Sequence, residues 1–557
     1  MQRCFLFVVS LLLLAGSIRA QAPAWQTAVL VGNANNANSY TFVRATAADA
    51  AGNVYLVGAL YGTVSFSGIS LSSAGSSDGY VAKWSRASNT FAWARRLGGT
   101  DDDEAVAVAV SGNSVYVTGF FGLTAAFDGI SLTSAGSSDV FVAKLTDAGS
   151  SASFAWAVRG GGVNLDQTFA LVVNDSSVYV AGYFTDNASF GGNVLSSSGG
   201  ADVLVAKLTD VGSSASFAWA VRAGGTQWDY VVGLAVNGPN VYVSGNFSGT
   251  AGFGTTTLSS TNSRNAFVAK LTDAGSAGSF TWALQTASAS TNSAYRLAVV
   301  GTSLYLSGSF TGTLGLGSAV LTSAGLFDAY LTKLTDAGAT GNFVWAQRAG
   351  GTGQDAGIDL VASGPVLYWA GYFSAIALFG STALSAVSST ASDVFVAKLT
   401  DAGASSSFAW VQAAGGAQAD YAAALALTGT GILYVGGQTH PPAAFGSQSV
   451  ASPFVNSNYT GFVASLQATP TATASPAALA GLRLLPNPAH GRATVLLPAV
   501  GGMATLAILD ALGRTIRTQA AATNAPAELD LTGLAPGLYA VRVQAGAATA
   551  MRRLVVE

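Results

Sequence analysis

The sequence predicts an all-β fold, in which a seven-bladed β-propeller closed by an N-terminal strand precedes a small Ig-like β-sandwich. Three observations lead to this prediction. A Val-Tyr or Leu-Tyr dipeptide recurs roughly every 63 residues, a period that is typical of repeat architectures. The first and last pieces of the repeated region are complementary parts of one repeat. Glycine contributes 67 of 557 residues, which suits short strands joined by tight turns.

Each repeat is predicted to contain four strands. The first is a small-residue apolar run, as at residues 105–110, and the second is the segment Val-Tyr-Val-x-Gly. The third is Asp-x-Phe-Val-Ala-Lys-Leu, as at 139–145, and the fourth is Phe-x-Trp-Ala. A Gly- and Ser-rich excursion such as 253–260 predicts a short hairpin between the second and third strands. The dipeptides are Val54-Tyr55, Val115-Tyr116, Val178-Tyr179, Val241-Tyr242, Leu304-Tyr305, Leu367-Tyr368 and Leu433-Tyr434.

The ends of the repeated region favour a closed ring. The last repeat stops after its third strand, at 461–466, and no Phe-x-Trp follows it. The missing piece, Ala24-Trp25-Gln26-Thr27-Ala28, stands before the first repeat. In a ring the N-terminal strand completes the final sheet and removes free edges. The alternative, an open β-solenoid, fits poorly because its coils are far shorter than about 63 residues.

The ordered motifs Val-Tyr-Val-x-Gly, Asp-x-Phe-Val-Ala-Lys-Leu, Phe-x-Trp-Ala and Gly-Gly resemble the bacterial β-propeller repeat family known as SBBP. The resemblance covers roughly residues 24–466. It implies a propeller domain, assigned here to residues 21–467, in a secreted or surface protein. It implies no common catalytic residue, and a fold of this kind leaves the activity open.

The N-terminus has the features of a secretory signal peptide over residues 1–20. Arg3 precedes an apolar stretch, 5–14, and Ala20 ends a run of small residues. The apolar stretch is too short to span a bilayer comfortably, so we expect no transmembrane segment in the mature chain. The only cysteine is Cys4, and the mature chain therefore has no disulfide, thiol chemistry or cysteine-bound metal.

The composition restricts the partners. Only 9% of residues are charged and the net charge is −3, so the basic surface that nucleic acid requires is missing. We expect no nucleic-acid partner. The amount of apolar sequence is ample for a large core.

A second domain follows a Pro/Thr/Ala linker at 468–478. Residues 479–557 have their own alternating strands, which predict a small antiparallel sandwich. The segment contains Leu485-Pro486-Asn487-Pro488, then Ile508-Leu509-Asp510-Ala511-Leu512-Gly513-Arg514, then Leu529-Asp530-Leu531 with Gly537-Leu538-Tyr539, and ends on Arg552-Arg553-Leu554-Val555-Val556.

These motifs resemble the C-terminal (type A) sorting domain of the type IX secretion system of Bacteroidota. Leu485 stands where that family often has an aromatic residue. The resemblance implies export by way of the periplasm to the cell surface or medium, with the secretion machinery as a partner. It also implies that the domain is usually removed after export.

Few residues could carry out catalysis. The mature chain has two histidines, and His490 belongs to the tail. A Ser-His-Asp triad would need His440, which precedes Pro441-Pro442 in a loop and lacks an evident oriented partner. The sequence therefore predicts no catalytic residue, no cofactor and no metal site.

Most aspartates recur once per repeat, and this recurrence favours a structural role, because a reaction needs its acid only once. The lysines of the third strand recur too and are expected to pair with repeated aspartates. The sets are Asp78, Asp139, Asp202, Asp328 and Asp393; Asp103, Asp166, Asp229 and Asp355; Asp147, Asp210, Asp273, Asp336 and Asp401; and Lys83, Lys144, Lys207, Lys270, Lys333 and Lys398.

Residues outside the repeat pattern are better functional candidates. The run Asp101-Asp102-Asp103-Glu104 suggests either a Ca²⁺ site or a solvated acidic turn, and the turn is favoured because consecutive side chains point in different directions. Trp84, Trp228 and Trp369 lie outside the repeated tryptophan set. An exposed Trp228 could stack on a sugar ring, and packing in the core is the competing interpretation.

The sequence thus predicts a secreted or cell-surface propeller that acts as a non-catalytic binding or adhesion module, with a glycan or a surface protein as its ligand. Two alternatives stay open. One is a polysaccharide-acting hydrolase or lyase that uses Asp101 or Glu104, and the other is a structural surface-layer component. Ligand identity, Ca²⁺ binding, anchoring or release, and oligomeric state are not decided by the sequence.

Overall fold

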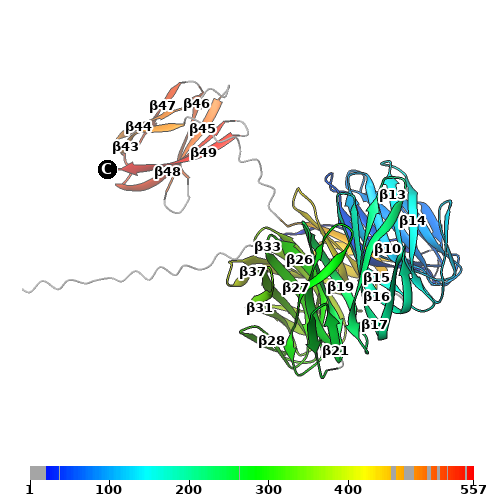
Figure 1. Cartoon of the computed structure of the whole chain (residues 1–557). Coiled ribbons are helices and arrows are strands. Elements are labelled where there is room, and N and C mark those ends of the chain that lie inside the picture. The colour runs from blue at the N-terminus through cyan, green and yellow to red at the C-terminus, as the bar shows by residue number, and fades with distance from the viewer. Residues whose placement is uncertain are drawn as a thin grey trace, which may run out of the picture. The chain divides into compact units, whose positions relative to one another are not determined.

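The computed structural model describes residues 21–34, 36, 38–262, 264–452, 459–468, 482–497, 503–510, 515–523, 525–545 and 548–557. The signal peptide predicted at 1–20 and most of the linker predicted at 468–478 lie outside these residues. Ala468 is described, and it is buried. The chain divides into two compact bodies, Met1–Ala468 and Thr469–Glu557. The regular elements of the described residues are all strands (Figure 1), which confirms the all-β class.

The described part of the first body contains seven four-stranded antiparallel repeats. The first strands are β3 (Tyr40–Ala48), β9 (Glu104–Ser111), β15 (Gln167–Asn174), β19 (Tyr230–Asn237), β26 (Asn292–Val300), β32 (Ala356–Ser363) and β38 (Tyr421–Leu427). The second strands are β4 (Val54–Tyr61), β10 (Ser114–Phe121), β16 (Ser177–Phe190), β20 (Asn240–Phe247), β27 (Ser303–Phe310), β33 (Val366–Ser374) and β39 (Ile432–Thr439).

The third strands are β7 (Asp78–Ser85), β13 (Asp139–Asp147), β17 (Asn193–Asp210), β23 (Asn265–Asp273), β30 (Asp328–Asp336), β36 (Ser392–Asp401) and β42 (Thr460–Gln467). The fourth strands of repeats 1 to 6 are β8 (Thr90–Gly99), β14 (Ala152–Gly162), β18 (Ala215–Gly225), β24 (Gly278–Gln285), β31 (Gly341–Gly351) and β37 (Ser406–Gly416). In repeats 1 to 6 the four strands pair in chain order.

The N-terminal strand completes the seventh repeat. β1 (Trp25–Val31) pairs antiparallel with β42, and Val29 lies opposite Val463. This pairing confirms that residues 24–28 begin the missing fourth strand. The first strands of successive repeats contact one another, and β38 of repeat 7 contacts β3 of repeat 1. The strand at one end of the chain therefore covers what would otherwise be an open sheet edge at the other.

Short hairpins join neighbouring repeats, which confirms the hairpin expected between the second and third strands. The hairpin of each repeat adds to the strand that ends the preceding repeat or to its continuation. The hairpins are β5 (Thr63–Phe66) with β6 (Ile69–Ser72), β11 (Thr124–Phe127) with β12 (Ile130–Thr133), β21 (Thr250–Phe253) with β22 (Thr256–Ser259), β28 (Thr313–Leu316) with β29 (Ala319–Thr322), β34 (Ile376–Phe379) with β35 (Thr382–Ser385), and β40 (Ala443–Phe445) with β41 (Gln448–Val450). In repeat 3 the ends of β16 and β17 form it, and β2 (Asn33–Ala34) and β25 (Ala287–Ser288) are the receiving strands of β5 and β28.

A buried aspartate ties consecutive repeats together. At the end of β13, Asp147 accepts hydrogen bonds from three side chains of repeat 1: the Tyr55 hydroxyl, the Lys83 ammonium and the Trp93 indole N–H. The same three donors recur at four further junctions. Across all five junctions, the tyrosine hydroxyl lies 2.7 Å from a carboxylate oxygen of the aspartate. The lysine Nζ lies at 2.5–2.7 Å and the indole Nε1 at 2.9–3.2 Å. The further acceptors are Asp210, Asp273, Asp336 and Asp401. For these five lysines the pairing with a repeated aspartate is confirmed.

The other two aspartate sets are structural as well. Asp139 forms an ion pair with Arg159, and Asp166 accepts from the backbone N–H of Gly162 and of Thr185. Gly161 stands between the two carboxylates with φ +150°, and a Cβ there would lie within 3 Å of both. The two carboxylates leave no room for a side chain at this position, which explains the glycine in the repeated Gly-Gly pair.

The second body is a sheet of seven strands among its described residues, in the order β46-β45-β48-β49-β43-β44-β47. A core that includes Leu484, Leu506 and Val543 packs within it. The Ig-like sandwich stays a prediction. The strands are β43 (Arg483–His490), β44 (Arg492–Leu496), β45 (Met503–Leu509), β46 (Thr515–Ala522), β47 (Pro526–Asp530), β48 (Gly537–Ala545) and β49 (Ala548–Val556).

The first prediction concerns the junctions. Replacing Asp210 by Asn removes the charge that pairs with Lys144 and should lower the free energy of unfolding by roughly 3 kcal/mol, because an unpaired buried ammonium is costly. Chemical denaturation measures the change. The matched control is Asp175→Asn at an exposed turn position, with an expected effect of at most about 0.5 kcal/mol. Equal effects of the two substitutions would contradict the proposed role of the junction.

A second prediction concerns pH. Burial raises the pKa of Asp103, Asp166 and Asp229 to about 7, and that of Asp355 and Asp420 to about 6. Hydrogen bonds from backbone N–H groups lower these pKa values but do not cancel the effect of burial. The folded state thus holds protons that the unfolded chain releases near pH 4. The resulting stabilisation is complete below pH 4 and is lost as pH rises through 6 to 7.

The unfolding free energy should therefore decrease less steeply between pH 4 and pH 7 in Asp166→Asn than in the wild type. The two slopes should differ by at most about 1.4 kcal/mol per pH unit. Urea denaturation at a series of pH values provides the slope. Asp175→Asn serves as the control and should leave the slope unchanged. An unchanged slope in Asp166→Asn would show that this carboxyl is ionised throughout the range.

Candidate functional site: the axial opening

Every first strand contains a β-bulge at the same place. The ladder with the second strand shifts register there, and one residue of the first strand is left without a partner; in β26 two residues are left. A bulge re-aims the side chain of the extra residue and commonly stands beside a site. The bulged residues are Arg44, Val106, Phe169, Val232, Tyr295 with Arg296, Ile358 and Ala423.

These residues line one hollow of about 200 Å³. Each of the seven repeats contributes to its wall, so the hollow lies where the first strands meet. We call it the axial opening. Its wall is mostly apolar, with an aromatic ring from Phe169 and another from Tyr295, and the guanidinium groups of Arg44 and Arg296 are its charged components.

A second level lies one residue further along the strands and borders a hollow of about 180 Å³. Five of its seven positions hold small residues: Ala45, Ala107, Ala170, Gly233 and Ala424. The other two hold Arg296 and Asp359, which line this hollow together. Small residues around the axis leave room for this pair of long or charged side chains.

Arg296 and Asp359 connect five repeats across the axis. Arg296 Nε lies 3.5 Å from Asp359 Oδ1. Arg296 Nη1 donates to the carbonyl of Val232 at 2.9 Å and to that of Phe169 at 3.4 Å. Asp359 Oδ2 accepts from the backbone N–H of Leu425 at 2.6 Å. Burial raises the pKa of Asp359, and the charge of Arg296 opposes that shift. The two charged side chains therefore meet at the axis, and each has hydrogen-bond or ion-pair partners.

Three of the four carboxylates in the run 101–104 have partners of their own. Glu104 forms an ion pair with Arg44 of the preceding repeat. Asp103 is fully buried and accepts from the backbone N–H of Gly99 at 2.6 Å. Asp102 accepts from the Ser77 hydroxyl at 2.9 Å. These three carboxylates have separate partners, and the described residues contain no group of three or more His, Cys, Asp or Glu side chains that could hold a metal.

Trp228 belongs to an aromatic row that leads to the axial opening. Its side chain is 51% exposed, and its ring meets that of Tyr183 edge-on at 5.6 Å. Tyr183 in turn lies 5.8 Å from Phe169 at the wall of the opening. The other two unrepeated tryptophans, Trp84 and Trp369, are buried. The structure thus connects the exposed tryptophan singled out in the sequence with the opening.

His440 lies in an aromatic group of its own. Its ring centroid is 4.0 Å from that of Tyr459, and Tyr459 contacts Tyr421 at 5.6 Å. Its Nδ1 lies 3.4 Å from the carbonyl of Ala419, where a catalytic histidine would instead meet an oriented carboxylate. His490 is exposed in β43 of the second body. Neither histidine joins the opening.

Sequence reasoning missed Arg44, Phe169, Tyr295, Arg296 and Asp359. Their common signal is that each interrupts the small apolar pattern of a first strand. Asp359 even stands in a first strand, which the sequence predicts to be a run of small apolar residues. A bulge has no reliable sequence pattern, so the alignment of these positions around one axis emerges only from the register of the strands.

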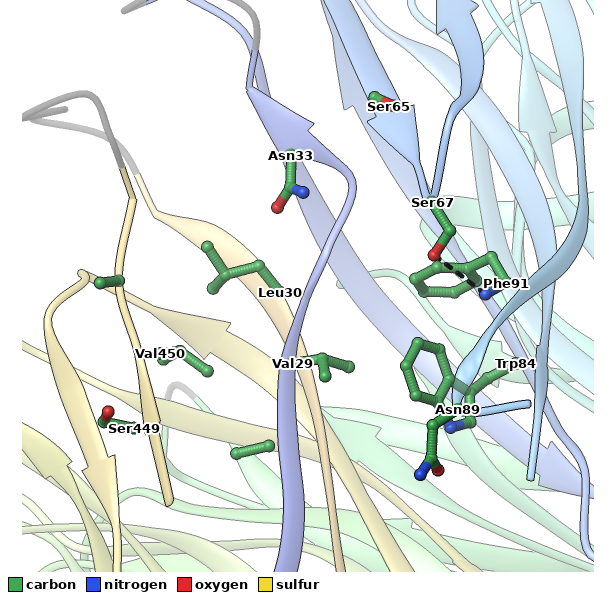
Figure 2. Close-up of a pocket in the computed structure, with 12 residues that line it drawn as sticks. Val29, Leu30, Asn33, Ser65, Ser67, Trp84, Asn89, Phe91, Ser449 and Val450 are labelled. Carbon is green, nitrogen blue, oxygen red and sulfur yellow. Dashed lines mark hydrogen bonds between the residues drawn. The ribbon is translucent and has the colours of Figure 1, made fainter. Parts of the chain in front are cut away.

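A second cavity lies at the seam where β1 closes the last repeat onto the first. Figure 2 shows Leu30 and Val450 on one side and Trp84 with Phe91 on the other. Its volume is about 330 Å³, and Ser67 accepts a hydrogen bond from the backbone of Phe91 at 3.1 Å. The described lining is apolar, serine and asparagine. It has none of the charged groups of the axial opening.

No helix among the described residues is long and apolar enough to span a bilayer. Comparison with curated proteins gives no match to the chain. Residues 483–557 match the family model of the secretion system C-terminal sorting domain, and this range runs from the first residue of β43 to the end of the chain. The C-terminal body is therefore a secretion system C-terminal sorting domain, which marks the protein as one exported by type IX secretion to the cell surface or the medium.

Proposed function

We propose that residues 21–467 form a seven-bladed β-propeller of the SBBP repeat type and act, outside the cell, as a non-catalytic binding or adhesion module. The observation that carries this proposal is the axial opening. Positions that hold the repeats together are nearly identical from repeat to repeat, whereas the seven bulged positions are occupied by six different residue types. Residue types that vary around the wall of a hollow are expected where a ligand is selected.

The chemistry of the opening favours a glycan as the ligand, with a surface protein as the second choice. Phe169, Tyr183 and Trp228 form a continuous aromatic row, and aromatic faces pack well on amphipathic sugar rings. Trp228, at the outer end, is half exposed. Arg44 is 45% exposed at its side chain and adds hydrogen-bond donors to the wall.

One observation favours binding over hydrolysis. The acids beside the axis, Glu104 and Asp359, are both held by arginines. A glycosidase needs two carboxyl groups free to flank the bond that breaks. If the experiments below failed to show binding without release, the protein would instead be a polysaccharide hydrolase or lyase, or a structural surface-layer protein.

The binding experiment uses the full-length chain on a panel of insoluble polysaccharides and whole cells. We expect saturable retention with no sugar released into the supernatant. Trp228→Ala and Phe169→Ala should each weaken retention roughly five-fold, because a lost stacking contact is worth about 1 kcal/mol. Val194→Ala, at an exposed apolar position of the hairpin in repeat 3, is the control and should bind normally.

Each other outcome identifies a different function. Released sugar that disappears in Glu104→Gln would make the protein an enzyme. Retention that Trp228→Ala and Phe169→Ala leave unchanged would place the ligand elsewhere than the opening. Self-association without retention on any polysaccharide or cell would support the structural role.

The export prediction is tested in cells that carry the type IX system. Deleting residues 483–557 should leave the protein inside the cell envelope, because this segment is the sorting domain. Fractionation of cells and medium with an antibody to the first body measures the distribution. Trp228→Ala is the matched control, since it should be exported normally. Export of the truncated chain would show that another segment carries the address.

A further inference from the structure

The junction between repeats 6 and 7 lacks the acceptor that five other junctions possess. Repeat 6 carries the same three donors, and its register is the same: Tyr368 lies opposite Lys398 in the ladder, and Lys398 lies opposite Trp410. At the junction before it, Asp401 accepts from Tyr305, Lys333 and Trp345. In repeat 7 the corresponding position is occupied by Ala468.

The backbone shows that Ala468 stands in the place of the aspartate. The N–H of Asp401 donates to the carbonyl of Pro365, just before β33, at 2.8 Å. The N–H of Ala468 donates in the same way to Gly431, just before β39, at 2.9 Å. Ala468 also packs in the same buried cluster as Tyr368 and Trp410. The methyl group replaces a side chain that is larger by one carboxylate.

The donors around this position lack their usual acceptor. Tyr368 is fully buried, and its hydroxyl has no hydrogen-bond partner in the described structure. Lys398 is half-buried over the Tyr368 ring, at 5.7 Å. Burial alone lowers the pKa of Lys398, whereas at an intact junction the hydrogen bond to Asp210 helps to raise the pKa of Lys144. A buried donor without an acceptor destabilises the folded chain.

We propose that Tyr368, Lys398 and Trp410 form a binding site for a small carboxylate anion, which occupies the place that the junction aspartate fills in five other junctions. One carboxylate oxygen would accept from the Tyr368 hydroxyl and the Lys398 ammonium, as Oδ2 of Asp401 does at its junction. The other would accept from the Trp410 indole N–H, as Oδ1 of Asp401 does from Trp345. The anion supplies the missing negative charge to the last junction before the chain leaves the first body.

The site is specific in shape as well as charge. Its donors correspond to those that hold the two oxygens of Asp401, and Ala468 differs from an aspartate only by the missing carboxylate. Formate and acetate fit this description. Binding stabilises the folded chain, because the unfolded chain has no such site.

The test is thermal unfolding of the full-length chain in sodium formate, with sodium chloride making up constant ionic strength. We expect the melting temperature to rise with formate along a saturating curve in the wild type. Ala468→Asp fills the site from within, so its melting temperature should show no such formate-dependent rise. A formate-detected saturation-transfer NMR signal, present in the wild type and lost in Ala468→Asp, measures binding directly. Lys398→Met provides a second variant that should lose both effects.

Asp401→Ala is the matched positive control, because it recreates the same vacancy at the preceding junction. Formate should raise its melting temperature more than that of the wild type, since two vacancies are then filled. A wild-type melting temperature that is identical in formate and chloride, with no transfer signal, would overturn the proposal. Equal formate effects in the wild type and in Ala468→Asp would overturn it too.

Discussion

The interaction on which this structure depends is the buried carboxylate that joins one repeat to the next. Asp147 and its equivalents lie at the end of a third strand, and their acceptor oxygens reach a tyrosine, a lysine and a tryptophan of the preceding repeat. Apolar packing between sheets is tolerant of sliding and rotation, whereas three donors converging on one carboxylate allow a single relative position. A buried ion pair adds little net stability by itself. Its contribution here is to specify how neighbouring sheets align.

Alignment at each junction is what makes closure possible. Small errors between repeats would accumulate around seven units, and β1 could then not reach β42. Beyond Cys4 the sequence offers no cysteine for a covalent closure, so the N-terminal strand is the element that joins the two ends of the repeated region. The junctions flanking repeat 7 are also the irregular ones, because Ala468 and Arg86 stand where the other repeats have aspartate. The seam cavity between β1 and Trp84 lies in the same region.

The repeated scaffold and the axial opening follow different rules. Residues that hold the repeats together must be the same in each, because the geometry of each junction is the same. The bulged residues of the first strands are free of that requirement, since none of them takes part in the Asp-Tyr-Lys-Trp contacts of the junctions. Arg296 and Asp359 use this freedom to cross-link five repeats, and the aromatic row from Phe169 to Trp228 uses it to reach solvent. A binding role outside the cell is consistent with both features.

The sequence by itself determined the strand content, the four-strand repeat, the pairing of the N-terminal strand with the last repeat, the pairing of five of the six repeated lysines with aspartates, and the sorting domain. Each of these leaves a periodic or ordered pattern, because the same physical requirement recurs at a fixed spacing. The tertiary structure alone decided which unrepeated residues share a site. Arg44, Phe169 and Tyr295 lie far apart in the chain, and a bulge in each strand turns them to one axis. The missing carboxylate at Ala468 likewise could be recognised only from the structure, because it shows itself through the unpaired donor of Tyr368, which packs in the same cluster.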